Sequence, residues 1–306
     1  MPDHSAIPAS VDDRAEVLAL RGDIAFYGGR YGEAIGLYRD ARRLADGPGT
    51  LFRIAQWQKK TGQPDAALAS FARAAQINTG RTAQFIANVL LQSGVIELER
   101  GNWPAAEQLF ASADARFPGY WLTEAHGAQM LALRGDLKGA ERRYLAIIAR
   151  TRQPNVIDAL AALYRAQGNA PASRHWAAIS GAIWARRLQQ LPEAAYAHAV
   201  DHELVLGDPA RALDLARRNM AARPYGDSAT LLGWALLANG RAAEARATLD
   251  ALNRTPWRTA QQFVALAEAD AMLGDSAGSD AARAAALQIN PRALDPAVPM
   301  LWFGHH

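Results

Sequence analysis

The chain has 306 residues, of which 50% are hydrophobic, and its 33 Lys and Arg residues nearly balance 30 Asp and Glu residues, for a net charge of +3. Such a small excess of positive charge does not indicate nucleic-acid binding. The lack of cysteine excludes disulfides, thiolate metal sites and cysteine nucleophiles. No apolar run reaches the roughly 18 to 20 residues that a membrane-spanning helix needs. Because alanine dominates the apolar residues and Val and Ile are sparse, we expect helices rather than strands.

The N-terminal segment, residues 1–14, is predicted to be disordered. Residues 1–11 contain two prolines and little periodic apolar content. They also lack the basic and then apolar pattern of a secretory signal peptide. We therefore expect a cytoplasmic protein by default, and a periplasmic one if a signal segment has been removed.

Residues 15–291 are predicted to form an array of helix pairs, because one glycine-centred pattern recurs along them. In each copy a helical apolar run ends at a glycine, and a polar or aromatic residue follows within two positions. These glycines are Gly29, Gly62, Gly101, Gly135, Gly168, Gly207, Gly240 and Gly274. Five of their seven spacings are 33 or 34 residues and the other two are 39, which is typical of a repeat architecture.

Each glycine is expected to end the first helix of a pair. A helix that reverses direction within a few residues needs a left-handed residue after its last turn, and glycine adopts that conformation without a Cβ penalty. Proline often opens the next helix, as at Pro64, Pro104 and Pro209. Proline suits the first helical turn, where its missing N–H costs nothing. The pattern therefore predicts helix-turn-helix joints.

Small and large residues recur at fixed offsets from these glycines. Alanine stands five positions after the glycine in six repeats, and Gly or Ala stands seven positions before it in seven. Nine positions after it stand Tyr38, Phe71, Phe110, Tyr144 and Leu249. The small residues let two helices approach closely, and the large residue fills the space between them. This pattern resembles the tetratricopeptide repeat family, whose signature places a small residue, alanine, an aromatic residue, alanine and proline at such offsets.

The resemblance implies an all-α fold, a right-handed α-solenoid of about eight helix-turn-helix repeats over residues 15–291. The repeats are expected to begin at Ala15, Pro48, Ala87, Trp121, Pro154, Glu193, Gly226 and Ala260. The two long intervals add residues to this pattern. Near 79–84 we expect a longer loop, and residues 182–191, which carry no helix breaker, should lengthen the second helix of the fifth repeat. A curvature break near 182–192, which could divide the solenoid into two lobes, is predicted there.

The C-terminal tail, residues 292–306, cannot be one regular helix because it contains Pro296 and Pro299. It includes the apolar run Met300-Leu301-Trp302-Phe303. Large apolar side chains cost roughly 1.5 to 3 kcal/mol each when they are left in water. We expect the tail to pack on the final repeat as a cap, with contact to a partner or a membrane as the alternatives.

Few patterns point to catalytic chemistry. Residues 274–278 match Gly-x-Ser-x-Gly, but that nucleophile motif needs a strand-to-helix turn, whereas Ser276 lies at a predicted helix-helix turn. His198 and His202 are spaced i and i+4 on one helix face, which can hold Zn²⁺ with a third ligand. The sequence assigns no third ligand, and the metalloprotease glutamate after the first histidine is missing. We therefore predict no catalytic residue, no metal and no cofactor, and keep the two histidines as the metal-binding alternative.

The resemblance places the candidate ligand-binding residues on the concave face of the first helices. They are Phe52, Gln56, Lys59, Lys60, Asn88, Gln92, His126, Gln129, Asn155, Asp158, Arg165, Asp201 and Trp234. Amides and a few charges beside aromatic rings suit an extended or helical peptide. One subset of the family binds a C-terminal carboxylate through a Lys/Asn clamp, but Lys59, Lys60 and Asn88 do not stand at its matching positions.

We therefore expect a non-enzymatic scaffold or adaptor that binds a protein or peptide ligand in the groove of the solenoid. One alternative is a metal-binding or enzymatic role centred on His198 and His202. The other is a nucleic-acid-associated scaffold, against which the small net charge argues. Self-association through the solenoid ends is a further alternative.

Overall fold

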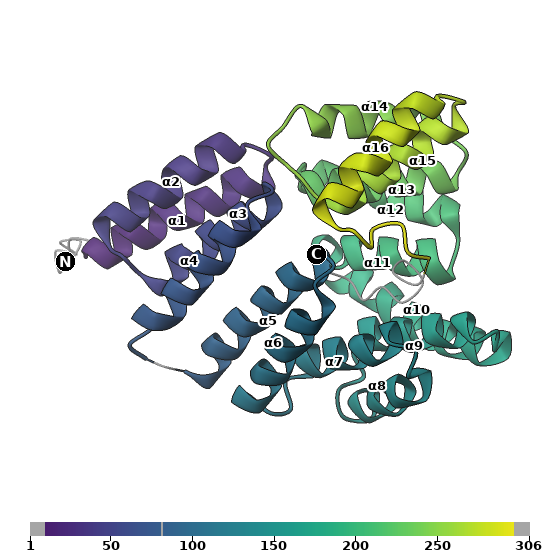
Figure 1. The fold of residues 1–306 in the computed structure, drawn as a ribbon, viewed down its shortest axis with the longest axis horizontal. Coiled ribbons are helices and arrows are strands. Elements are labelled where there is room, and N and C mark those ends of the chain that lie inside the picture. The colour runs from purple at the N-terminus through teal and green to yellow at the C-terminus, as the bar shows by residue number, and fades with distance from the viewer. Residues whose placement is uncertain (1–9, 81, 297–306) are drawn as a thin grey trace, which may run out of the picture.

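The computed structural model of the protein describes residues 10–80 and 82–296. Within these ranges the chain forms sixteen α-helices, and its only β-type pairing is an isolated bridge between Thr61 and Arg258. The helices follow one another as eight antiparallel pairs that curve into a ring-like superhelix (Figure 1). The predicted all-α solenoid of helical repeats is confirmed.

The helix bounds follow the predicted repeats closely. The first four pairs are α1 (Val11–Tyr27) with α2 (Tyr31–Leu44), α3 (Pro48–Lys60) with α4 (Pro64–Ile77), α5 (Ala83–Glu99) with α6 (Trp103–Arg116), and α7 (Trp121–Leu133) with α8 (Leu137–Thr151). The last four are α9 (Pro154–Ala166) with α10 (Ala170–Gln190), α11 (Pro192–Leu206) with α12 (Pro209–Ala222), α13 (Gly226–Ala238) with α14 (Ala242–Asn253), and α15 (Ala260–Met272) with α16 (Ser276–Ile289). Five predicted repeat starts are the first residue of a helix: Pro48, Trp121, Pro154, Gly226 and Ala260. Within the described part of the chain, no helix combines the length and apolar content needed to cross a bilayer.

The N-terminal boundary differs from the prediction. Helix α1 begins at Val11, so the disorder predicted for residues 1–14 is wrong for residues 11–14, while residues 1–9 lie outside the described ranges. The Ser10 hydroxyl accepts a hydrogen bond from the Asp13 N–H, and the Asp13 carboxylate accepts one from the Ser10 N–H, both at 3.0 Å. This reciprocal capping satisfies two backbone donors and starts the helix before its apolar pattern begins.

The two long repeat intervals lengthen helices. Helix α10 has 21 residues, so the predicted lengthening of the second helix in the fifth repeat is confirmed. In the third repeat, α5 begins at Ala83 and has 17 residues, so the loop predicted at 79–84 is shorter than expected and part of the insertion is helical. The curvature break near 182–192 remains a prediction.

The first and third repeats pack around their small and aromatic positions. A Cβ atom at Gly22 would lie 2.4 Å from the ring of Tyr38, and one at Gly94 would lie 2.6 Å from the ring of Phe110. Both rings are buried, at 2% exposure. The missing side chain on the first helix therefore makes room for the aromatic side chain of the second, as the offsets predicted.

Seven of the eight turn glycines have the predicted left-handed conformation, with φ between 70° and 88°. Gly207 is the exception, at φ −120°. In the first repeat, the N–H of Arg30 donates to the Ala25 carbonyl across the turn, at 2.8 Å. After Gly207 the corresponding N–H, that of Asp208, donates to the Glu203 carboxylate at 3.0 Å instead. Because a side chain accepts this hydrogen bond, the sixth turn does not need the left-handed residue.

The superhelix curves tightly enough for the first three repeats to contact the last three (Figure 1). In each contact, the turn between the two helices of one repeat lies against the loop that ends the repeat five places further along the chain. The three contacts are Gly29 against Pro224, Gly62 against Arg258, and Gly101 against Asn290. The solenoid therefore closes on itself in a regular register.

Aromatic side chains reinforce this closure. Trp257 is fully buried, and its ring lies 5.9 Å from that of Phe26, 5.5 Å from that of Tyr31 and 5.8 Å from that of Tyr225, between ring centroids. The Arg258 N–H donates to the Lys60 carbonyl at 2.9 Å, which ties the backbone of the second repeat to that of the seventh.

The beginning of the C-terminal tail takes part in the same closure. The guanidinium carbon of Arg292 lies 4.0 Å from the ring centroid of Trp103, in the third repeat. Residues 293–296 line a small cavity with α15 and α16. The described part of the tail therefore contacts the final repeat, where the cap was predicted, and also the third repeat, which was not predicted. Residues 297–306 of that predicted cap lie outside the described ranges.

Candidate binding channel

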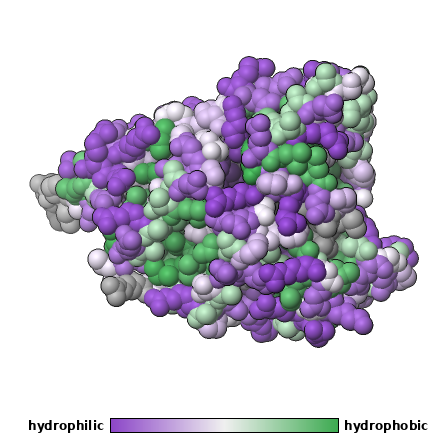
Figure 2. All heavy atoms as spheres, in the orientation of Figure 1, coloured by the Kyte–Doolittle hydropathy of each residue, from purple (hydrophilic) through white to green (hydrophobic). Residues whose placement is uncertain are grey.

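The first helices of the repeats line the inner face of the ring, where three cavities lie. The first, here called the tyrosine cavity, has a volume of about 330 Å³ and is lined by Tyr27, Tyr38, Gln56 and Tyr225, among others. The second, the acidic cavity, has about 450 Å³ and is lined by residues that include Asp158, Asp201, Trp234 and Glu268. The third, the closure cavity, has about 620 Å³ and lies between Gly62, Trp103, Arg258 and Asn290. In the view of Figure 2, hydrophilic side chains cover most of the surface, and apolar side chains gather over α4 and α5.

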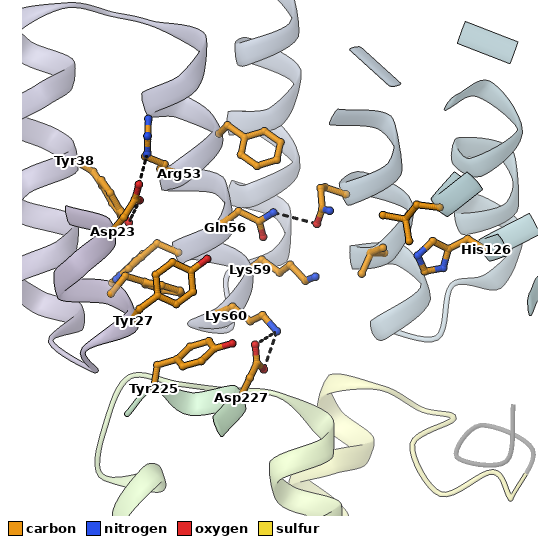
Figure 3. Close-up of a pocket in the computed structure, with 16 residues that line it drawn as sticks. Asp23, Tyr27, Tyr38, Arg53, Gln56, Lys59, Lys60, His126, Tyr225 and Asp227 are labelled. Atoms are coloured by element: carbon orange, nitrogen blue, oxygen red, sulfur yellow. Dashed lines mark hydrogen bonds and ion pairs between the residues drawn. The ribbon is translucent and has the colours of Figure 1, made fainter. Parts of the chain in front are cut away.

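A buried ion pair stands where the three cavities meet. The Lys60 ammonium lies 2.9 Å from the Asp227 carboxylate, with the two side chains 11% and 14% exposed. Asp227 lines all three cavities and Lys60 lines two of them. Figure 3 shows the two side chains pointing toward each other from α3 and α13. The predicted groove is therefore crossed by a contact between the second and seventh repeats.

The surroundings of this pair favour the charged form of Lys60. Burial is the largest single influence on the pKa of Lys60 and lowers it, but the charges of Asp227 and Glu99 and the hydrogen bond to Asp227 together outweigh burial and raise the pKa above its usual value. Lys59 differs, because burial lowers its pKa even though its ammonium lies 3.2 Å from the Glu99 carboxylate. Both lysines were predicted to contact ligand, and the structure gives each of them a carboxylate partner within the chain.

Other predicted residues of the first half are held by contacts with one another. The ring of Phe52 lies 5.0 Å from that of Phe71, and the Gln56 amide donates to the Gln92 carbonyl oxygen at 3.0 Å. His126 is stacked on Phe110 with ring centroids 4.7 Å apart. Burial lowers the pKa of His126 to about 4, so its imidazole is neutral at physiological pH.

In His126 the ring nitrogen Nδ1 lies 3.0 Å from the Gln129 side-chain oxygen, which fixes the orientation of the ring. Both residues are buried. Their part in the channel wall is therefore mainly to hold its shape.

The acidic cavity contains a histidine and carboxylate pair. Asp158 accepts a hydrogen bond from the Trp184 indole N–H at 2.7 Å, and its other oxygen lies 2.7 Å from Nδ1 of His202. Burial lowers the pKa of His202, but the hydrogen bond and charge of Asp158 outweigh it, so the pKa is raised. His198 lies 3.1 Å from the Asn155 amide. In the described ranges, no group of three or more His, Cys, Asp or Glu side chains could hold a metal ion.

Eleven of the thirteen predicted groove residues line one of the three cavities. Asn88 and Arg165 line none of them, and the Arg165 guanidinium donates to the Val205 carbonyl between α9 and α11. The prediction missed Tyr225 and Asp227, which line the channel near the start of α13. No local pattern identifies them, because their partners lie in the first two repeats, far away in the sequence.

Comparisons with known proteins give similarity to solved structures alone. No protein-family model matches the chain, and no curated protein matches it significantly. A tetratricopeptide repeat protein from Parabacteroides merdae is 13% identical, with 84% of this chain and 98% of that one covered and a TM-score of 0.47. A tetratricopeptide repeat protein from Thermus thermophilus is 21% identical, with coverages of 68% and 98% and a TM-score of 0.44. The pilF protein of Pseudomonas aeruginosa is 15% identical, with coverages of 71% and 96% and a TM-score of 0.47.

Proposed function

We propose that the protein is a non-enzymatic scaffold that binds a segment of a partner protein in its inner channel. The observation that carries this proposal is the position of the three cavities. The tyrosine and acidic cavities are lined almost entirely by first helices, and the closure cavity adjoins them where the ring closes. The three linings mix amides and charges with aromatic and aliphatic side chains. Such a lining is typical of sites that bind peptides through backbone hydrogen bonds and a few apolar anchors.

No catalytic role is proposed. His198 and His202 have the nearby polar partners Asn155 and Asp158, and no third side chain completes a metal site with them in the part of the chain that the structure describes. Ser276 is the first residue of α16 at a helix-helix turn, which does not provide the strand-to-helix elbow that its sequence motif requires.

Site-specific photo-crosslinking in the source cells tests the proposal. A photoreactive amino acid would be placed at Phe52 and Trp234, on the channel wall, and in separate variants at the exposed positions Arg39 and Asp280 on second helices. The expected result is a partner protein that crosslinks from the channel positions and not from the outer ones. Crosslinks from the outer positions alone, or from none of the four, would show that the channel is not the binding surface.

A further inference from the structure

The acidic cavity has a charge that differs from that of the chain as a whole. Its lining includes four carboxylates, Asp158, Asp201, Asp227 and Glu268, and no lysine or arginine. The whole chain has slightly more basic than acidic residues. Because the low-dielectric wall of a cavity strengthens the field of the charges that line it, this cavity favours a cationic ligand.

Two of these carboxylates already have cationic partners. Asp227 pairs with Lys60, and Asp158 pairs with His202, whose raised pKa favours the imidazolium form. Glu268 is exposed and forms no ion pair with any described residue. The carboxylate of Glu268 therefore adds negative charge to the lining that no cation of the described residues offsets.

A tryptophan in the same cavity provides a second, independent observation. Three other tryptophan rings carry a cation from the chain: Arg292 at 4.0 Å from the centroid of Trp103, Arg187 at 5.2 Å from Trp184, and Lys60 at 5.3 Å from Trp257. Trp234 is half-buried against the core of the last repeats and carries no such cation from the described residues. Its ring can thus bind a cation, and no described residue supplies one.

Apolar side chains complete the wall. Leu231 and Leu204 line the cavity, and so does Met272, which is 48% exposed at the end of α15. An exposed methionine beside a tryptophan adapts to apolar side chains of different shapes. The cavity therefore combines an apolar surface with negative charge, at a volume in the range of roughly 300 to 1,000 Å³ that is usual for ligand sites.

We propose that the acidic cavity binds a basic amphipathic segment of the partner protein. An arginine or lysine side chain of that segment contacts the ring of Trp234 and the carboxylate of Glu268, and its neighbouring apolar side chains pack against Leu231 and Met272. This inference rests on the proposed function, because it assigns the partner's chemistry at one part of the same channel.

Binding of synthetic peptides tests the charge and the site together. The probe is a short peptide of alternating Leu and Arg that carries a neutral fluorophore, and the matched peptides replace Arg with Glu or Gln. Fluorescence anisotropy with the full chain is expected to show binding of the Arg peptide alone, and the affinity should fall as NaCl is raised from about 50 to about 300 mM. Equal binding of the Glu peptide, or binding that is independent of salt, would overturn the proposal.

Variants then locate the binding site. Trp234→Leu and Glu268→Gln are each expected to weaken binding of the Arg peptide by about fivefold, since a cation–π contact or an ion pair at the surface contributes on the order of 1 kcal/mol. Asp280→Asn is the control, because it removes an exposed carboxylate of the same repeat on α16, away from the cavity. Affinities that stay unchanged in both cavity variants, or that fall equally in the control, would exclude this cavity as the site.

Three further outcomes relate this inference to the proposed function. If spermine displaces the Arg peptide as effectively as an unlabelled copy of the peptide, the cavity binds free polycations rather than a peptide segment, and the inference fails. If the crosslink from Trp234 identifies a partner segment without basic residues, the charge assignment fails while the scaffold function stands. If no channel position crosslinks to a partner, both fail.

Discussion

Replacing Gly29 by alanine would test whether the ring is closed in solution. Gly29 has φ 74°, and a Cβ atom at this position would lie 2.5 Å from the carbonyl oxygen of Pro224, in the sixth repeat. Gly240 is the matched control, because it holds the same turn position in the seventh repeat with φ 70°, and a Cβ atom there would have no other heavy atom within 4 Å. The two substitutions therefore share the same backbone strain, and only one of them clashes across the closure.

The magnitudes follow from these two geometries. A left-handed alanine costs roughly 1–2 kcal/mol in either variant. At Gly29 the new methyl group also meets a backbone oxygen, which no side-chain rotation can move, so the overlap costs a further amount of about 1–3 kcal/mol or forces the first and sixth repeats apart.

Urea unfolding and small-angle X-ray scattering measure the two effects. The free energy of unfolding should fall in both variants, and further in Gly29→Ala. The radius of gyration should increase in Gly29→Ala alone, because an opened superhelix is more extended. Equal stabilities together with equal radii of gyration would mean that the contact between Gly29 and Pro224 does not hold the ring closed.

Four other substitutions, in three experiments, have expected results that unfolding measurements can check. Asp227→Asn leaves the buried Lys60 ammonium without its carboxylate and should cost about 3–5 kcal/mol, whereas adding Lys60→Met should recover much of this loss in a double-mutant cycle. Because buried His126 is neutral in the folded protein, the free energy of unfolding should fall by up to about 3 kcal/mol as the pH is lowered from 6.5 toward the folded-state pKa of about 4. His126→Gln should remove this pH dependence. The pKa of His202 is raised, so the pH dependence has the opposite direction. The contribution of His202 to the free energy of unfolding is complete below pH 6.5 and is lost as the pH rises through the folded-state pKa. His202→Gln should therefore make the free energy of unfolding less dependent on pH in that range.

The repeat architecture could be predicted because its determinants are close together in the sequence. Gly22 and Tyr38 belong to one helix pair, and the same small and aromatic positions recur in most of the other pairs. A pattern of this kind specifies a local packing, and eight copies of it specify a stack. The helix starts and most channel residues followed from that register alone.

The closure could not be predicted, because it depends on geometry that accumulates along the chain. Whether Lys60 meets Asp227 depends on every rotation between the second and seventh repeats, and small differences in each rotation add up. The unusual turn at Gly207 could not be predicted for a different reason. At the sixth turn the Glu203 carboxylate accepts the Asp208 N–H, and a single glutamate in a helix does not reveal such a role.

Closure also changes how the channel can respond to a ligand. In an open solenoid each repeat is stabilised by its neighbours, so an end repeat can loosen without affecting the distant ones. Here Asp227 lines the acidic cavity and also holds Lys60 of the second repeat. A cation held by Trp234 and Glu268, as we propose, would also attract the carboxylate of Asp227, so we expect the affinity for the cation and the stability of the Lys60–Asp227 contact to be linked, each changing the other by the same factor. The ion pair at the centre of the ring is thus the point where the fold and the proposed binding site depend on each other.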